Sequence, residues 1–166
     1  YSFVFFLVFH SIEYMENTIS FNSKFGLISA TEIDNKITKI KFSKKKTRGR
    51  MTKVLKNLKK KINLYFQNKT DKIEVKIRIQ GNLVQKKVWK QLRKIKKGQT
   101  KSYGEIAKKL RISPRYVGRI CGENRHILVI PCHRILRSNG ALGGFSAPGG
   151  ISLKKKLLKF EGLKFK

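Results

Sequence analysis

Short apolar runs separated by turn residues fill the first third of the chain, a pattern typical of antiparallel strands. They predict three strands, Tyr14–Phe21, Leu27–Thr31 and Ile37–Phe42, with turns at residues 22–26 and at Asp34–Asn35. A basic loop, Ser43–Arg50, follows the third strand. We therefore expect a small antiparallel sheet in this part of the chain.

A further apolar stretch, Phe3–Phe9, precedes these strands. It is far too short to span a bilayer, and it lacks the positive region and small-residue cleavage site of a signal peptide. We interpret it as a strand or an upstream extension, and we expect no membrane partner.

Helical periodicity begins at Met51. Apolar residues recur every three or four positions up to Phe66, which predicts an amphipathic helix whose lysines form a solvated face. Ile73–Ile79, after this helix, is predicted to be a strand or the linker into a second domain.

Four more helices are predicted in the second half: Asn82–Lys97, ended by Gly98; Ser102–Leu110, with a capping box to Glu105; Ser113–Gly122; and Leu153–Phe160, capped by Ser152. The second and third, joined by a tight turn, form a candidate helix-turn-helix. In the last helix, Lys154, Lys155 and Lys156 are expected to face solvent or a phosphate backbone. The fold class is therefore α+β, with an N-terminal domain over residues 1–78 and a mainly helical domain over residues 79–166.

Charge narrows the class of partner. The chain carries 40 Lys and Arg residues against 9 Asp and Glu, a formal net charge of +31. Such a field favours polyanions, nucleic acid first, although a lysine-rich composition also arises from base composition or growth at high temperature.

Cysteine and histidine spacing points away from metal and disulfide sites. Cys121 and Cys132 fit neither a redox pair nor a zinc cluster, and the three histidines complete no recognised ligand set. We therefore expect no metal, no cofactor and a reducing compartment.

The candidate chemistry lies in the apolar run Val129–Leu136, which contains Pro131, Cys132, His133 and Arg134. Pro131 cannot donate to a sheet, so the run is predicted to be an edge strand or to leave the sheet there. As thiolate, Cys132 would be a strong nucleophile. On the tetrapeptide alone, a buried free cysteine acting as a small hydrophobe is an equal alternative.

Together with the two short helices and the loop Gly143–Ser146, the Pro-Cys-His-Arg motif resembles that of the O6-alkylguanine-DNA alkyltransferases, or methylated-DNA–protein-cysteine methyltransferases. The resemblance runs from about Gln80 to Gly162. It implies a ribonuclease-H-like N-terminal domain and a winged-helix-like C-terminal domain. It also implies a DNA repair enzyme that flips out O6-alkylguanine, with O4-alkylthymine as a second candidate, and transfers the alkyl group irreversibly to its own cysteine in a single turnover.

The same resemblance implies roles for four catalytic residues. Cys132 would be the nucleophile, and Asn124 would hold the turn before it. His133 would deprotonate the thiol through a water, and an extended segment, in which neighbouring side chains point to opposite sides, would leave room for that water. Glu161 would stabilise the imidazolium, so Glu161→Gln should slow transfer far more than it lowers stability.

DNA and base contacts are implied for a second group of residues. Arg115 would fill the stack vacated by the flipped base, and the Tyr103 hydroxyl would donate to the leaving guanine. Gly118 would let its helix approach the groove. The further DNA contacts are Ser102 and Arg134, and the further base contacts are the Ile135 carbonyl, Phe145 and Ser146.

The chain departs from the family pattern in three regions: a helix, a turn and a loop. Tyr116 and Arg119 are large in a helix that the family keeps small, which puts its docking in doubt. No proline follows Asn124 closely, and Phe145 replaces a frequent tyrosine.

Other functions remain open at this point. One is an alkyltransferase-like protein that only binds damaged DNA, although such proteins lack the cysteine. Others are a basic winged-helix DNA-binding protein and a Cys-His hydrolase, but the former leaves Cys132, His133 and Glu161 unexplained. We expect a monomer, cytoplasmic in a prokaryote and nuclear in a eukaryote.

Overall fold

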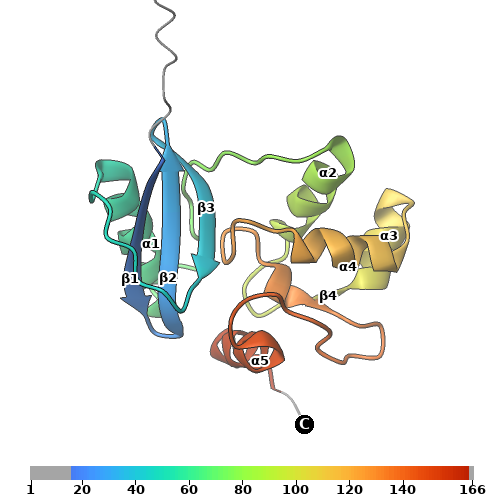
Figure 1. Cartoon of the computed structure of the whole chain (residues 1–166). Helices are drawn as coiled ribbons and strands as arrows, with labels where there is room; N and C mark the ends of the chain where they lie inside the picture. Colours follow the sequence, from blue (N-terminus) through green and yellow to red (C-terminus); the bar gives the residue numbers. More distant parts are fainter. Residues whose placement is uncertain (1–15, 165–166) are drawn as a thin grey trace, which may run out of the picture.

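A computed structural model describes residues 16–164 of the chain. Its first element is a three-stranded antiparallel sheet of β1 (Asn17–Ser23), β2 (Gly26–Ile33) and β3 (Lys36–Phe42), in that order (Figure 1). Asp34 and Asn35 form the tight turn between β2 and β3 with φ of 50° and 58°, as a two-residue hairpin requires. The three predicted strands are confirmed, whereas Phe3–Phe9 and the start of the first strand lie outside the described residues.

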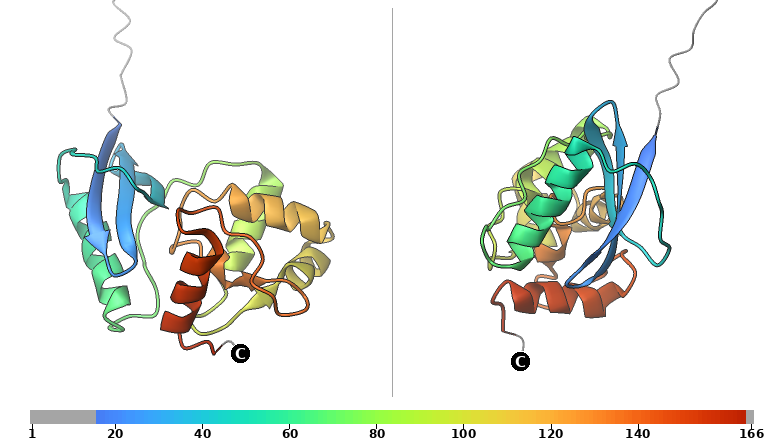
Figure 2. Two further views of the ribbon diagram at one scale, coloured as in Figure 1. Left: turned by 60° about the horizontal axis from the view of Figure 1, so that its bottom comes forward. Right: turned by 90° about the vertical axis from the view of Figure 1, so that its left-hand side faces the viewer.

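Helix α1 (Lys53–Phe66) covers one face of this sheet (Figure 2). Thr52 caps it by accepting a hydrogen bond from the Leu55 amide at 3.2 Å. Its inward residues Leu55, Leu58 and Ile62 are fully buried. Each such side chain contributes about 1.5–3 kcal/mol of transfer free energy on burial.

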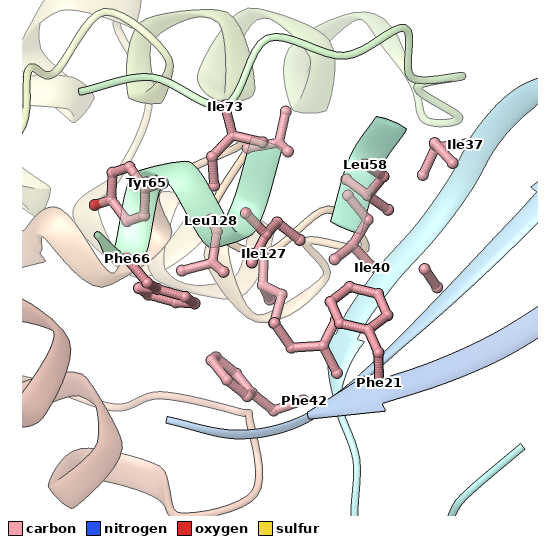
Figure 3. Packing of buried hydrophobic residues seen from close by; sticks show 14 of the residues in the cluster. Phe21, Ile37, Ile40, Phe42, Leu58, Tyr65, Phe66, Ile73, Ile127 and Leu128 are labelled. Atoms are coloured by element: carbon pink, nitrogen blue, oxygen red, sulfur yellow. The ribbon is translucent and has the colours of Figure 1, made fainter. Parts of the chain in front are cut away.

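The core under the sheet also contains residues from much later in the chain. Ile127 and Leu128 lie between α1 and the sheet, beside Ile40 (Figure 3). Leu153 and Leu157, from the last helix, belong to the same cluster. The segment that leads into the Pro-Cys-His-Arg motif is therefore anchored in the core of the first half.

An extended segment connects the two halves, and Ile77 touches the sheet through a single bridge to Ile37. Residues 73–79 are thus a linker rather than a strand of the sheet. The boundary that we propose between residues 78 and 79 falls inside it. Among residues 16–164 no helix is long and apolar enough to cross a membrane.

The second half is mostly helical. Its helices are α2 (Leu83–Leu92), α3 (Tyr103–Leu110), α4 (Pro114–Gly122) and α5 (Gly150–Phe160), and a short parallel pair joins β4 (Lys101–Ser102) to β5 (Ile135–Leu136). Trp89 of α2 packs in this second core and donates its indole N–H to the Ile120 carbonyl at 3.2 Å. The α+β class is confirmed, whereas the ribonuclease-H-like and winged-helix labels stay predictions.

Two helix boundaries differ from the prediction. Helix α2 ends at Leu92 rather than Lys97, because the chain turns at Arg93 and Lys94, and Gly98 lies in a separate turn. Helix α5 begins at Gly150 behind Gly149, so Ser152 lies inside it and caps nothing.

The apolar run around the motif is a strand only at its end, where Ile135–Leu136 form β5. Residues 126–130 form a turn closed by the Ile130 amide on the His126 carbonyl at 2.8 Å. Cys132–Arg134 form a 3-10 helix, η1, closed by the Arg134 amide on the Pro131 carbonyl at 3.0 Å. These local bonds satisfy buried backbone groups without a sheet.

Candidate active site

Cys132 opens η1 and is 6% exposed. The side-chain nitrogen Nδ2 of Asn124 lies 3.2 Å from the Cys132 sulfur and donates to the Ile130 carbonyl at 2.8 Å. The side-chain oxygen of Asn124 accepts from the backbone amide of His126 at 2.9 Å. Burial raises the pKa of the Cys132 thiol, and the Asn124 donor opposes that rise. Asn124 thus holds the turn before Cys132, as predicted, and also gives the sulfur a hydrogen-bond donor.

The other cysteine has a different environment. Cys121 lies on α4, is buried, and has no hydrogen-bond donor on its sulfur within residues 16–164. Burial raises its pKa to about 12. It therefore stays a neutral thiol at physiological pH, and the geometry favours Cys132 as the nucleophile.

His133 contacts Glu161 behind the thiol. Its Nε2 lies 2.6 Å from the Glu161 carboxylate, and both side chains are 1% exposed. Burial alone would raise the pKa of Glu161, but the hydrogen bonds from His133 and Arg134 hold it at about 2. The carboxylate is thus ionised and can only accept, so Nε2 of His133 carries the hydrogen and Nδ1 keeps a lone pair. Because burial also lowers the pKa of His133, the imidazole is neutral and can act as a base.

The relation between Cys132 and His133 differs from the expected one. In a 3-10 helix successive side chains are about 120° apart, rather than on opposite faces as in a strand. The extended geometry used to infer a bridging water is therefore wrong for this segment.

The structure corrects the prediction that Arg134 contacts DNA. It is buried, donates to both carboxylate oxygens of Glu161 at 2.8 and 3.1 Å, and donates to the Ile95 carbonyl at 2.6 Å. Its guanidinium balances the buried carboxylate and is unavailable to a phosphate. The assignment of Arg134 to DNA is therefore wrong.

Sequence reasoning missed Tyr65 as a site residue. Its hydroxyl donates to Glu161 and accepts from Arg134 at 3.2 Å, so α1 of the first half supplies part of the network. The sequence placed Tyr65 on the buried stripe of its helix. The available signal was chemical, since a buried tyrosine hydroxyl usually needs a polar partner.

Cys132 opens into a pocket of about 820 Å³. Six of the predicted site residues line it: Tyr103, Arg115, Gly118, Cys132, Phe145 and Ser146. Cys121 and six other residues complete the lining. Tyr116 and Arg119 are not among its lining residues, and the Arg119 side chain is 73% exposed and paired with Glu123 at 3.0 Å. The two large side chains that depart from the family pattern, Tyr116 and Arg119, therefore lie outside the pocket lining.

Tyr103 lies between two glycines. A Cβ at Gly118 would lie 3.7 Å from its ring, and a Cβ at Gly143 would lie 3.1 Å from it, too close for an unchanged fit. Gly143 also has φ of +67°, a conformation that favours glycine. Burial raises the pKa of Tyr103 to about 12, so its hydroxyl stays a donor in the pocket.

The remaining predicted residues have local partners. Ser102 caps α3 by accepting from the Glu105 amide at 3.0 Å, which confirms the capping box. Ser146 donates to the Gly122 carbonyl at 3.4 Å, and the Ile135 carbonyl accepts from Lys154 at 2.5 Å. Residues 16–164 contain no cluster of three His, Cys, Asp or Glu side chains suited to a metal ion.

The structure also corrects the prediction that Lys154 faces solvent or a phosphate backbone. Instead of facing solvent it is fully buried, with Nζ 2.5 Å from the Ile135 carbonyl and 3.4 Å from the Gly144 carbonyl. It follows Leu153 on the inward face of α5, and it links β5 to the loop that lines the pocket. Burial lowers its pKa from 10.5 to about 8.

We expect this lysine to make stability depend on pH. Because its pKa is lower in the native than in the unfolded state, the native protein releases the proton first, and stability rises between pH 8 and 10.5. The contribution is at most about 3 kcal/mol, at about 1.36 kcal/mol per pKa unit. Urea unfolding of wild type and Lys154→Met at several pH values measures it. Equal pH slopes for the two proteins would contradict the assignment.

Comparison with known proteins agrees with this geometry. Residues 83–163 match the family described as 6-O-methylguanine DNA methyltransferase, DNA binding domain. The methylated-DNA–protein-cysteine methyltransferase of Metallosphaera sedula is 39% identical over 145 residues, covering 86% of this chain and 91% of the relative. That of Sulfolobus acidocaldarius is 44% identical over 103 residues, covering 62% of this chain and 64% of the relative.

Solved structures show the same fold. Mycobacterium tuberculosis O6-methylguanine methyltransferase superposes with a TM-score of 0.79 at 27% identity, over 89% of this chain and 93% of its own. The Mycobacterium tuberculosis OGT in complex with DNA gives 0.78 at 28% identity, over 87% and 91%. With a buried Cys132 backed by His133 and Glu161 in a matching fold, the chain belongs to the methylated-DNA–protein-cysteine methyltransferase family.

Proposed function

We propose that this protein repairs O6-alkylguanine in double-stranded DNA by moving the alkyl group to Cys132, once per molecule, as a monomer in the compartment that holds the DNA. The observation that supports the proposal is the position of Cys132 between a pocket and a histidine–carboxylate pair. One side of the residue opens into the pocket, and the adjacent His133 is bonded to an ionised carboxylate.

The proton path begins at the thiol. The Cys132 proton passes through a water to Nδ1 of His133, and Glu161 stabilises the imidazolium that results. Arg134 and Tyr65 keep the carboxylate ionised and oriented through their hydrogen bonds. Asn124 stabilises the thiolate through its contact with the sulfur.

Transfer is a single displacement. The thiolate attacks the carbon bonded to O6, the S–C bond forms as the C–O bond breaks, and guanine leaves with the electron pair and gains a proton. The protonated hydroxyl of Tyr103 donates a hydrogen bond to the leaving base. The thioether does not revert, so each molecule acts once.

DNA binding must present an extrahelical base, because a thiol that is 6% exposed cannot reach a stacked one. Helix α4 enters the minor groove, and Arg115, exposed in its first turn and lining the pocket, fills the vacated stack. The closing loop around Phe145 and Ser146 covers the base.

Affinity for undamaged duplex DNA is expected to fall steeply with salt and to show little sequence preference. Each phosphate neutralised adds about −0.9 to the slope of log affinity against log salt. Arg115→Ala removes a positive charge at the DNA face and should lower the affinity, whereas Lys56→Ala, on the exposed face of α1, should leave affinity and slope unchanged. Fluorescence anisotropy across a salt series measures both, and a salt-independent affinity would show that the charge of +31 does not act at the DNA face.

The experiment that tests the proposal is mass spectrometry after incubation with a duplex containing one O6-methylguanine. We expect one methyl group per protein, mapped to the peptide that contains Cys132. Undamaged duplex of the same sequence is the control. Binding without a mass increase would identify a protein that only binds damaged DNA. A label on Cys121 would show that Cys121, and not Cys132, is the nucleophile.

A further inference from the structure

The face of α4 that lines the pocket carries small side chains. Beyond Arg115, the lining residues Gly118, Cys121 and Gly122 recur at intervals of one helical turn, so they share that face. None of the three is larger than cysteine. On the loop side the pocket is lined by Gly143, Gly144, Phe145 and Ser146.

Cys121 is the largest of these three wall residues, and it lies near the reacting groups. It belongs to the same buried cluster as Cys132, with Tyr103 packed against that cluster. Cys121, Cys132 and Tyr103 line the same pocket, and the two cysteines reach it from different elements, α4 and η1.

The thiol of Cys121 has no role in the transfer itself. Its high pKa keeps it neutral, and a buried neutral cysteine behaves as a small apolar side chain. Its contribution to the pocket is therefore its size.

The pocket is roomy for its proposed task. About 820 Å³ lies within the range of about 300–1,000 Å³ that holds drug-sized ligands, more than a methylated base requires. We infer that Cys121 sets the size of the O6-alkyl group that the protein accepts, and that groups as large as benzyl react. The inference rests on the alkyl transfer proposed above.

The test compares single-turnover rates on two duplexes of one sequence, one with O6-methylguanine and one with O6-benzylguanine. Wild type should react with both. Cys121→Leu should lower the benzyl rate by about tenfold or more while the methyl rate changes by about twofold or less, because filling a pocket penalises the larger group. Cys121→Ser, which keeps the size, should leave both rates near wild type.

Two further variants complete the design. Arg119→Leu places the same leucine on the exposed face of α4, outside the pocket, and should leave the ratio of the two rates unchanged. Gly122→Leu adds bulk where a Cβ meets no atom within 4 Å, so it narrows the pocket without crowding the core. It should lower the benzyl rate selectively. If Cys121→Leu loses methyl transfer as well, that variant has failed to fold, and Gly122→Leu then tests whether the pocket wall limits the size of the alkyl group.

A wild type that transfers methyl but not benzyl would overturn the inference and leave the proposed function intact. So would an unchanged ratio of rates in Cys121→Leu and Gly122→Leu. A wild type that transfers neither group would instead refute the proposed function.

Discussion

Cys132→Ala is expected to abolish alkyl transfer and to leave DNA affinity within about twofold of wild type, since surface contacts away from the change are unaffected. The variant removes the only thiol in the described residues that has both a hydrogen-bond donor and a neighbouring base. Helix α4 and its exposed Arg115 are untouched. Gel-based transfer of a labelled alkyl group and fluorescence anisotropy measure the two properties on the same duplex.

The matched control is Cys121→Ala. It removes a thiol of the same pocket that has no hydrogen-bond donor on its sulfur among the described residues and no adjacent histidine, so transfer of a methyl group should persist. Residual transfer in Cys132→Ala, lost in the double variant, would show that Cys121 is the acceptor.

Glu161→Gln is expected to lower the free energy of unfolding by about 3–5 kcal/mol, the usual cost of removing one partner of a buried ion pair. The change leaves the Arg134 guanidinium buried without its counter-charge. It also removes the charge that stabilises the His133 imidazolium, so transfer slows. This replaces the sequence-based prediction of a near-native melt, which assigned Arg134 to DNA and so did not include its buried pairing with Glu161. Thermal melts and single-turnover rates below the melting transition measure both effects.

A charge-balanced pair of substitutions separates the two effects. Replacing Glu161 and Arg134 together by leucine removes both buried charges, and should recover part of the lost stability, because paired removal is often neutral. Transfer should stay slow, since His133 still lacks its carboxylate. Recovery of the rate together with the stability would remove Glu161 from the mechanism.

Local patterns predicted the elements whose boundaries are set by local bonds. The Asp34–Asn35 turn, the Ser102 cap and the start of a helix at Ser113 each depend on neighbours within a few residues. Where tertiary packing decides, prediction failed. The apolar run before Cys132 reads as a strand, but Ile127 and Leu128 fill a distant core and its backbone closes in local turns.

The four residues that the family resemblance implied for catalysis lie together in the structure, whereas two basic residues expected to contact DNA or solvent are buried. Asn124, Cys132, His133 and Glu161 do lie together. Arg134 and Lys154 were taken for DNA or solvent contacts because basic side chains are usually exposed. Their burial depends on acceptors far away in the sequence, Glu161 and the carbonyls of Ile135 and Gly144, which no spacing rule connects to them.

The hydroxyl of Tyr65 on Glu161 has a consequence for exchanging parts between proteins. Because α1 supplies a donor to the carboxylate of the other half, a chimera with a foreign N-terminal half is competent only if that half brings a tyrosine to the same place. The two halves are therefore matched to each other at this contact. In a chain cut within the linker, the Glu161 carboxylate should regain the Tyr65 hydrogen bond only when the two fragments reassemble.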